Sequence, residues 1–594
     1  MCGVFVVYSK NGNSLSKTQC LNASDKLYNR GPDSLKYSFF RKNTLFISNT
    51  VLSITGKIFT DKSLSVSKNK NYTLSFNGEI YNYKTLGNNY RSTIVDKNTT
   101  DSKVLADLYD IVDYQSIPKI LNGMFAYVVY DKREQRLIIV NDPQGEKNLY
   151  YYENKNFFLV SSTTEAINSF LKEKNLNINP LRNYLFTRHY MALKETSFKD
   201  IYLFSNASNS VYEFHNNKLK INKYEDPIDW ISEKKYMKFM KLPEEEVIDY
   251  LDFKLNEQAK IMIPNQKFGC VVSGGVDSTL QAYLINQYST SKINLVVDHK
   301  NKDPIVNKIS NFDPYFLSKI KKIEMNSKKY RQLSNKCYKT VASPWQTHDL
   351  PSRMLLSSYF RKNNCKVFFS ADGCDELFGG QQIYEKVFKN KYDYKKNFSP
   401  YSTMTNLFNL PKIFLDKSYE SSIDSNWQRV LKNYNFIVDP KSKNIQSSLF
   451  LDYFLQSIAV ANRSNDLICC ENSVEPRNLF IQKNILKIII NLPLKYKINF
   501  TQKDPLLRQK YILKKIFLKY FDKKLLFKKS GFSGFPSSIK IKGSNSIISN
   551  LFGLKKHIPQ SKFYYDKKNF SRDYQWKLTN IAIFLDVFNI KLKF

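Results

Sequence analysis

Apolar positions recur along this chain with the periods of both strands and helices. Residues 126–130 and 136–140 are compatible with strands of a sheet. A helix is predicted from Pro243, because acidic residues fill its first turn and apolar residues recur behind them on one face. The apolar face consists of Val247, Ile248, Leu251, Leu255 and Ala259.

The sharpest change of pattern lies at residues 268–278, which read FGCVVSGGVDS. The apolar run predicts a short buried strand, and the serine and two glycines after it predict a tight loop that opens a helix. Leu280, Tyr283, Leu284 and Tyr288 continue at helical spacing, and residues 293–297 predict the next strand. This order is typical of a parallel α/β sheet, which binds ligands at the carboxyl ends of its strands.

The loop after this strand has the chemistry of an anion site. Adjacent glycines let backbone N–H groups approach a ligand, and two serines and the helix N-terminus add donors and positive dipole. The donors would come from Ser273, Gly274, Gly275 and Ser278. No lysine follows as in a Walker loop. A plain turn between strand and helix is the simpler alternative.

A second polar motif, residues 370–380, follows the apolar strand 367–369. It places Asp372, Asp375 and Glu376 within five residues. Such carboxylates are costly at a strand end unless they are exposed or bound to cations. The alternative is an acidic helix N-terminus, which the helix dipole favours.

Length and composition limit the class of protein. The 594 residues are too many for one core and indicate two or three domains, and 42% hydrophobic residues suffice for globular folding. No run of about 18 apolar residues predicts a membrane span, and the N-terminus predicts a first strand instead of a secretory signal. We therefore expect a cytoplasmic protein without a membrane partner. Eight cysteines without paired spacing indicate neither a zinc site nor a disulfide framework.

The charge is strongly positive, with 91 Lys and Arg against 53 Asp and Glu, or +38. Such a balance can indicate nucleic-acid binding. Here the lysines are spread over the whole chain without a dense basic tract, so a compositional bias is the favoured interpretation. No nucleic-acid partner is expected.

Cys2 is a candidate nucleophile. The small second residue permits removal of Met1, which would leave Cys2 with a free α-amino group of near-neutral pKa. That amine can serve as the base that activates its own thiol.

Several motifs in the first third of the chain resemble those of class II glutamine amidotransferases. They are Arg30–Asp33 (RGPD), Phe76–Asn82 (FNGEIYN), Asp101 in TTDSKVL, and Gly123–Ala126 (GMFA). The resemblance implies an α+β N-terminal-nucleophile (αββα) glutaminase domain at residues 1–224. It also implies that Cys2 attacks glutamine, that Asn77 and Gly78 bind the oxyanion, and that Asn77, Glu79 and Asp101 bind glutamine. Elsewhere an Asn-Gly pair is often a type I′ hairpin turn.

One expected glutamine contact is absent. The family's usual arginine that binds the glutamine α-carboxylate corresponds to Val51. Losing such a contact costs about 1.5–3 kcal/mol, so we expect that Lys57, Arg41 or another cation compensates, or that the enzyme relies partly on free ammonia.

The second half resembles the ATP pyrophosphatases and, among them, the asparagine synthetases. The matching motifs are Ser273–Ser278, Ser370–Gly380, Asn472–Arg477 and Lys529–Phe532. The resemblance implies an α/β parallel-sheet ATP-pyrophosphatase domain at residues 243–594, joined by a linker at 225–242. It assigns ATP contacts to Ser273, Gly274, Gly275, Asp277, Ser278, Val297 and Ala371. Mg²⁺ would bind Asp277 and Asp375, Asp372 would lie near the acyl-adenylate, and Lys529 would neutralise pyrophosphate.

The sequence thus predicts an enzyme that uses glutamine, ATP and Mg²⁺ to amidate a carboxylate, most directly that of aspartate. The alternatives are a paralogue that amidates another carboxylate, such as a sugar acid of a surface polysaccharide, and a binding protein descended from a synthetase. Departures at residues 298–310 and 467–482 motivate the paralogue, and Val51 motivates the binding protein. A homodimer is one assembly that the chain could form, and the sequence leaves the oligomeric state open.

Overall fold

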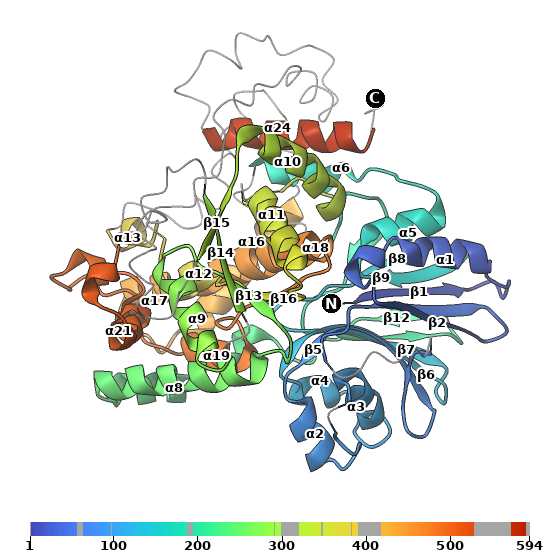
Figure 1. Ribbon diagram of the computed structural model, residues 1–594, viewed down its shortest axis with the longest axis horizontal. Coiled ribbons are helices and arrows are strands. Elements are labelled where there is room, and N and C mark those ends of the chain that lie inside the picture. The colour runs from blue at the N-terminus through green and yellow to red at the C-terminus, as the bar shows by residue number, and fades with distance from the viewer. Residues whose placement is uncertain are drawn as a thin grey trace, which may run out of the picture.

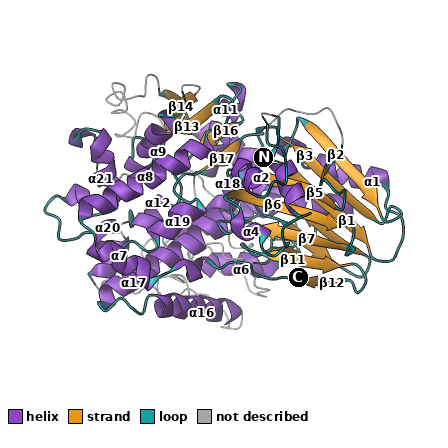
Figure 2. Cartoon of the chain, turned by 90° about the horizontal axis from the view of Figure 1, so that it is seen from below, coloured by secondary structure: helices purple, strands orange, loops and turns teal. Residues whose placement is uncertain are grey.

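The computed structural model describes residues 2–55, 63–96, 98–186, 194–289, 292–298, 320–345, 349–381, 383–389, 417–527 and 572–589. Within them, the strands form two antiparallel sheets and one parallel sheet. The antiparallel sheets lie together in the N-terminal part of the chain, beside a helix-rich part that contains the parallel sheet (Figures 1 and 2).

The two antiparallel sheets each contain six strands. The first has the order β10 (Ile201–Leu203), β8 (Tyr150–Glu153), β9 (Phe157–Ser161), β1 (Gly3–Ser9), β3 (Leu45–Val51), β2 (Ser34–Phe40). The second has the order β12 (Lys218–Lys220), β11 (Asn209–Glu213), β7 (Arg136–Asn141), β6 (Gly123–Asp131), β5 (Tyr72–Ile80), β4 (Ser65–Val66). The strands expected at 126–130 and 136–140 lie within β6 and β7.

The sheets pack face to face because alternate side chains of each strand point to opposite faces. Val4 and Val6 of β1 lie in one buried cluster with Val128 of β6 and Ile139 of β7. The opposite faces are covered by helices, namely α1 (Lys17–Asp25) and α5 (Thr164–Leu171) on the first sheet and α2 (Tyr83–Asn89), α3 (Asp101–Leu108) and α4 (Ile117–Ile120) on the second. This confirms the expected order of helix, sheet, sheet and helix layers.

The parallel sheet contains five strands. Its order is β15 (Lys321–Glu324), β14 (Lys292–Asp298), β13 (Phe268–Val271), β16 (Val367–Phe369), β17 (Glu475–Arg477). All four neighbouring pairs are parallel. The predicted parallel α/β sheet is therefore confirmed, with β13 at its centre.

Helices bury both faces of this sheet, as parallel sheets require. One face packs against α8 (Glu244–Met262), α9 (Val276–Asn286) and α19 (Lys483–Ile489). The other packs against α10 (Ser327–Val341), α11 (Leu350–Lys362) and α18 (Arg463–Cys470). The remaining described α-helices are α6 (Ile178–Phe186), α7 (Glu233–Lys241), α12 (Cys374–Phe378), α13 (Ile383–Phe388), α16 (Lys417–Asn433), α17 (Pro440–Asp452), α20 (Leu494–Lys497), α21 (Tyr511–Tyr520) and α24 (Arg572–Val587).

Two sequence expectations meet differences here. The helix after the glycine loop ends at Asn286, so Tyr288 lies beyond it in a turn and is 38% exposed. The segment 225–242, expected to be a linker, is folded: it contains a 3₁₀ helix (Pro227–Trp230) and α7, and it buries Trp230 and Phe239 in the core of the second domain. Short apolar runs between charged residues concealed this packing in the sequence.

None of the helices in the described part of the chain has the length and apolar character needed to cross a membrane.

The predicted apolar face of α8 offers a test of this core. Leu251 is fully buried, whereas Phe253 on the same helix is 58% exposed. We expect Leu251→Ala to lower stability by about 2–5 kcal/mol, because it leaves a cavity in a packed core. The midpoint of urea unfolding, followed by circular dichroism, measures the effect.

Phe253→Ala is the matched control on the same helix and should change stability by less than about 1 kcal/mol. Equal midpoints for the two variants would contradict the described packing of α8.

Candidate active site

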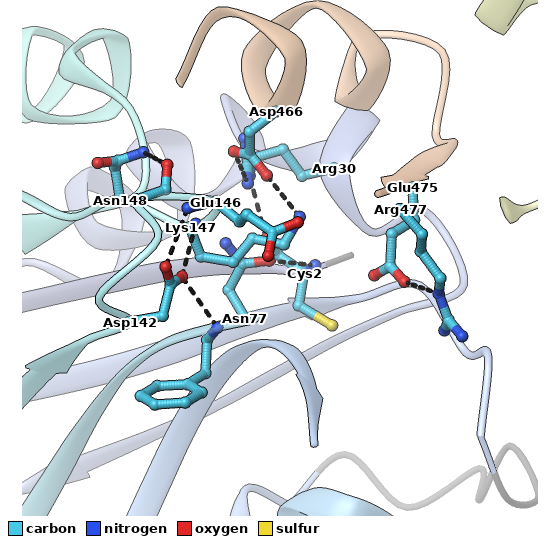
Figure 3. A network of polar contacts seen from close by, with 12 residues as sticks. Cys2, Arg30, Asn77, Asp142, Glu146, Lys147, Asn148, Asp466, Glu475 and Arg477 are labelled. Atoms are coloured by element: carbon cyan, nitrogen blue, oxygen red, sulfur yellow. Dashed lines mark hydrogen bonds and ion pairs between the residues drawn. The ribbon is translucent and has the colours of Figure 1, made fainter. Parts of the chain in front are cut away.

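Cys2 lies in the first domain just before β1, and its side chain is 9% exposed. Its backbone nitrogen donates a hydrogen bond to Asn77 Oδ1 on β5 (2.9 Å; Figure 3). Asn77 Nδ2 is buried without a hydrogen-bond partner among the described residues. The same side chain therefore holds the nitrogen of Cys2 and keeps one donor for a developing oxyanion. Burial raises the pKa of the Cys2 thiol, so the thiol needs a base to become a nucleophile.

Gly78 follows inside the same strand. Asn77 and Gly78 pair with Ala126 and Phe125 of β6, so they form no hairpin turn. Gly78 has φ +147°, and a Cβ at this position would lie 2.1 Å from Met124 O. Only glycine fits at this position, so the fold itself explains why the motif has a glycine here.

Two further predicted residues lie beside this strand. Asp101, at the start of α3, accepts a hydrogen bond from the backbone N–H of Ile80 (3.1 Å). Burial raises the pKa of Asp101 to about 6, so the carboxylate is ionised at neutral pH. Glu79 is also buried, and its Oε2 lies 3.2 Å from Arg477 Nη2 of the second domain. The structure thus brings Cys2, Asn77, Gly78, Glu79 and Asp101 together.

Arg41 does not take the place of the family's arginine that corresponds to Val51. Val51 is at the far end of the β2–β3 hairpin from Arg41, because Val51 pairs with Ser34 and the hairpin closes after Phe40. The Arg41 guanidinium instead lies 4.6 Å from the centre of the Phe214 ring. Lys57 lies outside the described residues. Two other guanidinium groups do reach this region, those of Arg30 and Arg477.

Arg30 connects Cys2 to the second domain. Its Nε donates to the carbonyl oxygen of Cys2 (3.0 Å), and its Nη2 lies 2.7 Å from Asp466 Oδ2 on α18. Lys147 Nζ lies 2.8 Å from the other oxygen of Asp466 (Figure 3). Burial opposes the charge of Asp466, but the two cations hold its pKa below the usual value. The sequence motifs did not reveal this three-residue ion network.

Arg477 on β17 makes a second connection. Its Nε donates to Glu475 Oε1 (2.9 Å), while its Nη2 faces Glu79. One guanidinium cannot neutralise two buried carboxylates fully, and the two respond differently. Burial raises the pKa of Glu79 to about 8, whereas Arg477 and Lys147 oppose burial at Glu475, whose pKa is lowered.

The glycine loop of the second domain has the predicted form. It follows β13, Gly274 has φ +80°, and α9 begins at Val276. Ser278 Oγ accepts from the Ser273 N–H (3.1 Å) and lies 2.9 Å from Ser273 Oγ. The N-cap residue Gly275 has no side chain to satisfy the first N–H groups of α9, so they remain available to an anion.

Asp277 and Asp375 converge on one cation, Lys510. Lys510 Nζ contacts the Asp277 carboxylate and lies 2.6 Å from Asp375 Oδ1. Burial opposes the charge of Lys510, but the two carboxylates raise its pKa. A Cβ on Gly380 would lie 2.0 Å from Asp375 Oδ1, so this glycine makes room for the pair.

This arrangement fits the predicted magnesium site. No third His, Cys, Asp or Glu of the described chain completes a metal-binding group with these carboxylates. Mg²⁺ commonly binds one or two carboxylates together with substrate phosphates and water. Asp277 and Asp375 would supply that share. Lys510 was not predicted, because nothing in its local sequence distinguishes it from the surrounding lysines.

Asp372 follows β16, and both of its carboxylate oxygens accept hydrogen bonds. Arg353 of α11 binds it in a bidentate manner, with Nη1 and Nη2 each 2.7 Å from one oxygen. Ser370 Oγ and Asn465 Nδ2 also donate to Asp372 Oδ2, both at 2.9 Å. Burial opposes ionisation, but Arg353 lowers the pKa of Asp372, which therefore stays a carboxylate. No sequence motif pointed to Arg353 or Asn465.

The remaining residues predicted to contact ATP or pyrophosphate are Ala371, Val297 and Lys529. Ala371 is half-buried next to Asp372 and packs on the core of the second domain. Val297 lies on β14, opposite Ile323 of β15, and its side chain lies outside the described part. Lys529 lies outside the described residues.

A cavity of about 20 Å³ lies where the two domains meet. Its walls include Glu146 and Lys147 of the first domain and Ser370, Asp372, Asn465 and Arg477 of the second. The volume suffices for one small molecule such as water. Because Arg477 also reaches Glu79, the cavity adjoins residues of both candidate sites.

The fold defines a two-domain protein, in which two stacked antiparallel sheets between helices precede an α/β domain with a parallel sheet. Comparison with known families agrees: a glutamine amidotransferase domain model matches residues 1–225, and an asparagine synthase model matches residues 257–575. The chain belongs to the asparagine synthase family.

Individual relatives are distant. The chain is 30% identical over 176 residues to a probable asparagine synthetase (glutamine-hydrolyzing) of Acanthamoeba polyphaga mimivirus, covering 29% of this chain and 32% of that protein. It is 24% identical over 406 residues to the asparagine synthetase (glutamine-hydrolyzing) of Cricetulus griseus, covering 65% and 68%. The chain thus spans about a third of the first relative and about two thirds of the second.

A solved structure of the glutamine phosphoribosylpyrophosphate amidotransferase from B. subtilis overlaps 50% of this chain and 75% of its own, with 12% identity and a TM-score of 0.29. An overlap of this size adds nothing to the fold assignment, which rests on the strand pairing.

The Asp466 network gives a testable prediction. Asp466→Asn would leave Arg30 and Lys147 buried without their shared carboxylate, so we expect a loss of about 3–5 kcal/mol. Urea unfolding measures it. Glu257→Gln, which removes an exposed pair with Lys254 (2.6 Å), is the control and should cost less than about 1 kcal/mol. A loss no greater than that of the control would contradict a buried, paired Asp466.

Proposed function

We propose that this chain is a glutamine-dependent asparagine synthetase. It adenylates the side-chain carboxylate of aspartate with MgATP and amidates it with ammonia from glutamine, giving asparagine, AMP, pyrophosphate and glutamate. The observation that carries the proposal is the meeting of two chemically different sites at one buried interface. Cys2 beside Asn77 is typical of acyl transfer, whereas a glycine loop with two converging carboxylates is typical of nucleotide cleavage.

In the first site, the Cys2 sulfur attacks the side-chain carbonyl of glutamine, with the α-amino group as base. The amide nitrogen leaves as ammonia, and water hydrolyses the resulting thioester to glutamate. Asn77 Nδ2 and the Gly78 N–H bind the oxyanion. Asp101, ionised above about pH 6, binds the glutamine α-ammonium group, and Glu79 lies beside it.

In the second site, the acceptor carboxylate attacks the α-phosphorus of ATP and pyrophosphate leaves. Ser273, Gly274, Gly275, Ser278 and the α9 N-terminus bind the leaving phosphates. Mg²⁺, held by Asp277 and Asp375, would neutralise phosphate charge. Lys510 and Lys529 add positive charge, and Val297 and Ala371 contact the nucleotide.

Ammonia then attacks the acyl carbon and AMP leaves. The cavity at the domain interface supports an internal route for ammonia, because it adjoins both sites and has room for one molecule of this size. Asp372 faces the cavity and orients the acceptor or the ammonia as an ionised carboxylate.

A paralogue that amidates another carboxylate, such as a polysaccharide sugar acid, is the second candidate. Gln482 favours it: this residue lies in the segment 467–482 that departs from the family pattern, and its Nε2 donates to Oε1 of Glu146 (3.1 Å), a residue of the cavity wall. The surroundings of the acceptor therefore differ from the usual pattern.

The reaction is tested by incubating the enzyme with ATP, Mg²⁺, ammonium chloride and a panel of carboxylates that includes aspartate. We expect aspartate to elicit AMP and pyrophosphate in equal amounts together with asparagine. Turnover with a sugar acid instead would select the paralogue. ADP and phosphate as products, or no turnover with any acceptor, would refute the adenylation step.

The nucleophile is tested by Cys2→Ala. We expect glutamine-dependent amidation to fall by at least about a thousandfold, because no other group can form the thioester, while the ammonia-dependent rate changes less than about twofold. Both rates are read from pyrophosphate release. Loss of both activities would mean that Cys2 is structural.

A further inference from the structure

Glu146 stands apart among the charged side chains that line the interdomain cavity. Lys147 pairs with Asp466 (2.8 Å), Asp372 with Arg353 (2.7 Å) and Arg477 with Glu475 (2.9 Å). Glu146 forms no ion pair with any residue that the structure describes. Glu146 is 7% exposed, and a buried carboxyl group without an ion pair is costly as a carboxylate unless other groups stabilise its charge.

The position of Glu146 is fixed by its neighbours. Its backbone N–H donates to Asp142 Oδ1 (3.0 Å; Figure 3), and its Oε1 accepts from Gln482 Nε2 (3.1 Å). Burial and the nearby Asp142 raise the pKa of Glu146. The side chain thus lies on the cavity wall as a carboxyl group that can hold a proton.

Unsatisfied polar atoms on residues that hydrogen-bond to the cavity wall indicate a small polar occupant. Within the described residues, Gln482 Oε1 and both side-chain polar atoms of Gln144 are buried without hydrogen-bond partners. Gln482 contacts Glu146, and the Gln144 carbonyl accepts from Asn462, another residue of the cavity wall (2.7 Å). Native proteins leave few such atoms unpaired, so a water-sized donor is expected beside them.

Asp372 cannot serve as the proton partner of such an occupant. Its two oxygens already accept four hydrogen bonds, and Arg353 keeps it ionised. A carboxylate in this state is a weak base. Between these two carboxyl groups of the cavity wall, Glu146 is therefore the one that can exchange a proton with a basic small molecule.

We propose that the cavity is a binding site for ammonia in transit, with Glu146 as its proton partner. The carboxyl group gives its proton to the ammonia nitrogen and forms a carboxylate paired with ammonium, and the reverse transfer releases neutral ammonia toward the acyl-adenylate. Atoms and charge balance without another reactant. Ammonia and ammonium are both close to water in size, which matches a cavity of about 20 Å³. The proposal rests on the proposed amidation.

Two variants test it by kinetics. Glu146→Gln keeps an acceptor for Gln482 but cannot exchange a proton, and Glu146→Leu removes both properties. With ammonium chloride as donor, we expect KM for ammonium to rise about tenfold or more in both, since a charge-assisted hydrogen bond is lost, with kcat within about twofold. With glutamine, glutamate formed per pyrophosphate should rise severalfold, because ammonia escapes.

Glu153→Gln is the control, since Glu153 belongs to the same domain and pairs with Lys10 at the surface (2.5 Å). Thermal midpoints of all variants separate a folding defect from a loss of ammonia binding. A KM for ammonium within about twofold of the wild type, together with unchanged stoichiometry, would overturn the proposal.

A binding measurement separates this site from the proposed reaction. Crystals soaked in thallium(I) acetate, whose cation resembles ammonium in size and charge, should show an anomalous peak beside Glu146 that is absent in Glu146→Leu. A peak in wild-type crystals without ammonia-dependent turnover would support the site and refute the proposed function. Normal wild-type turnover, no anomalous peak beside Glu146, and a KM for ammonium that is the same in the Glu146 variants and the wild type would refute the site. The proposed function would then still stand.

Discussion

The position of Cys2 depends on a buried charge that belongs to the other domain. Asp466 on α18 binds Arg30 and Lys147 of the first domain, and Arg30 in turn holds the carbonyl of Cys2. A carboxylate is costly in a buried interface unless cations surround it, and these cations need it equally. The domains therefore fit together in a defined orientation, and the geometry at Cys2 is set only when they are joined.

The supply of cations also decides which buried carboxyl groups are ionised. Asp466 has two cations, Asp372 has the bidentate Arg353, and both have lowered pKa values. Glu79 shares Arg477 with Glu475, and Glu146 forms no ion pair within the described chain, so burial outweighs the nearby cations and raises the pKa of both. The interface thus contains carboxylates held in the ionised form and carboxyl groups that can exchange protons, and the proposed transfer of ammonia uses both kinds.

The sequence predicts what is local and misses what the fold brings together. The glycine loop, the parallel sheet and the α8 face follow from short patterns, and the stacked antiparallel sheets follow from the resemblance of the first motifs to a known family. Arg353, Asp466 and Lys510 do not, because their partners lie 19, 436 and 233 residues away. Arg41 was a plausible substitute for the missing arginine by composition, but strand register places it at the wrong end of a hairpin. The folded state of residues 225–242 was likewise hidden among charges.

One long helical segment contributes both to the wall of the cavity and to the contact between the domains. From α17 through a π-helical stretch (Tyr453–Asn462) into α18, the backbone stays helical without a break, and it carries Asn462 and Asn465 beside the cavity and Asp466 in the domain contact. Rotating or shifting this helical segment to reshape the cavity would also displace Asp466, whose charge joins the domains. A change of acceptor is therefore expected to come from side-chain substitutions on neighbouring loops, because the domain contact restrains the helical segment itself.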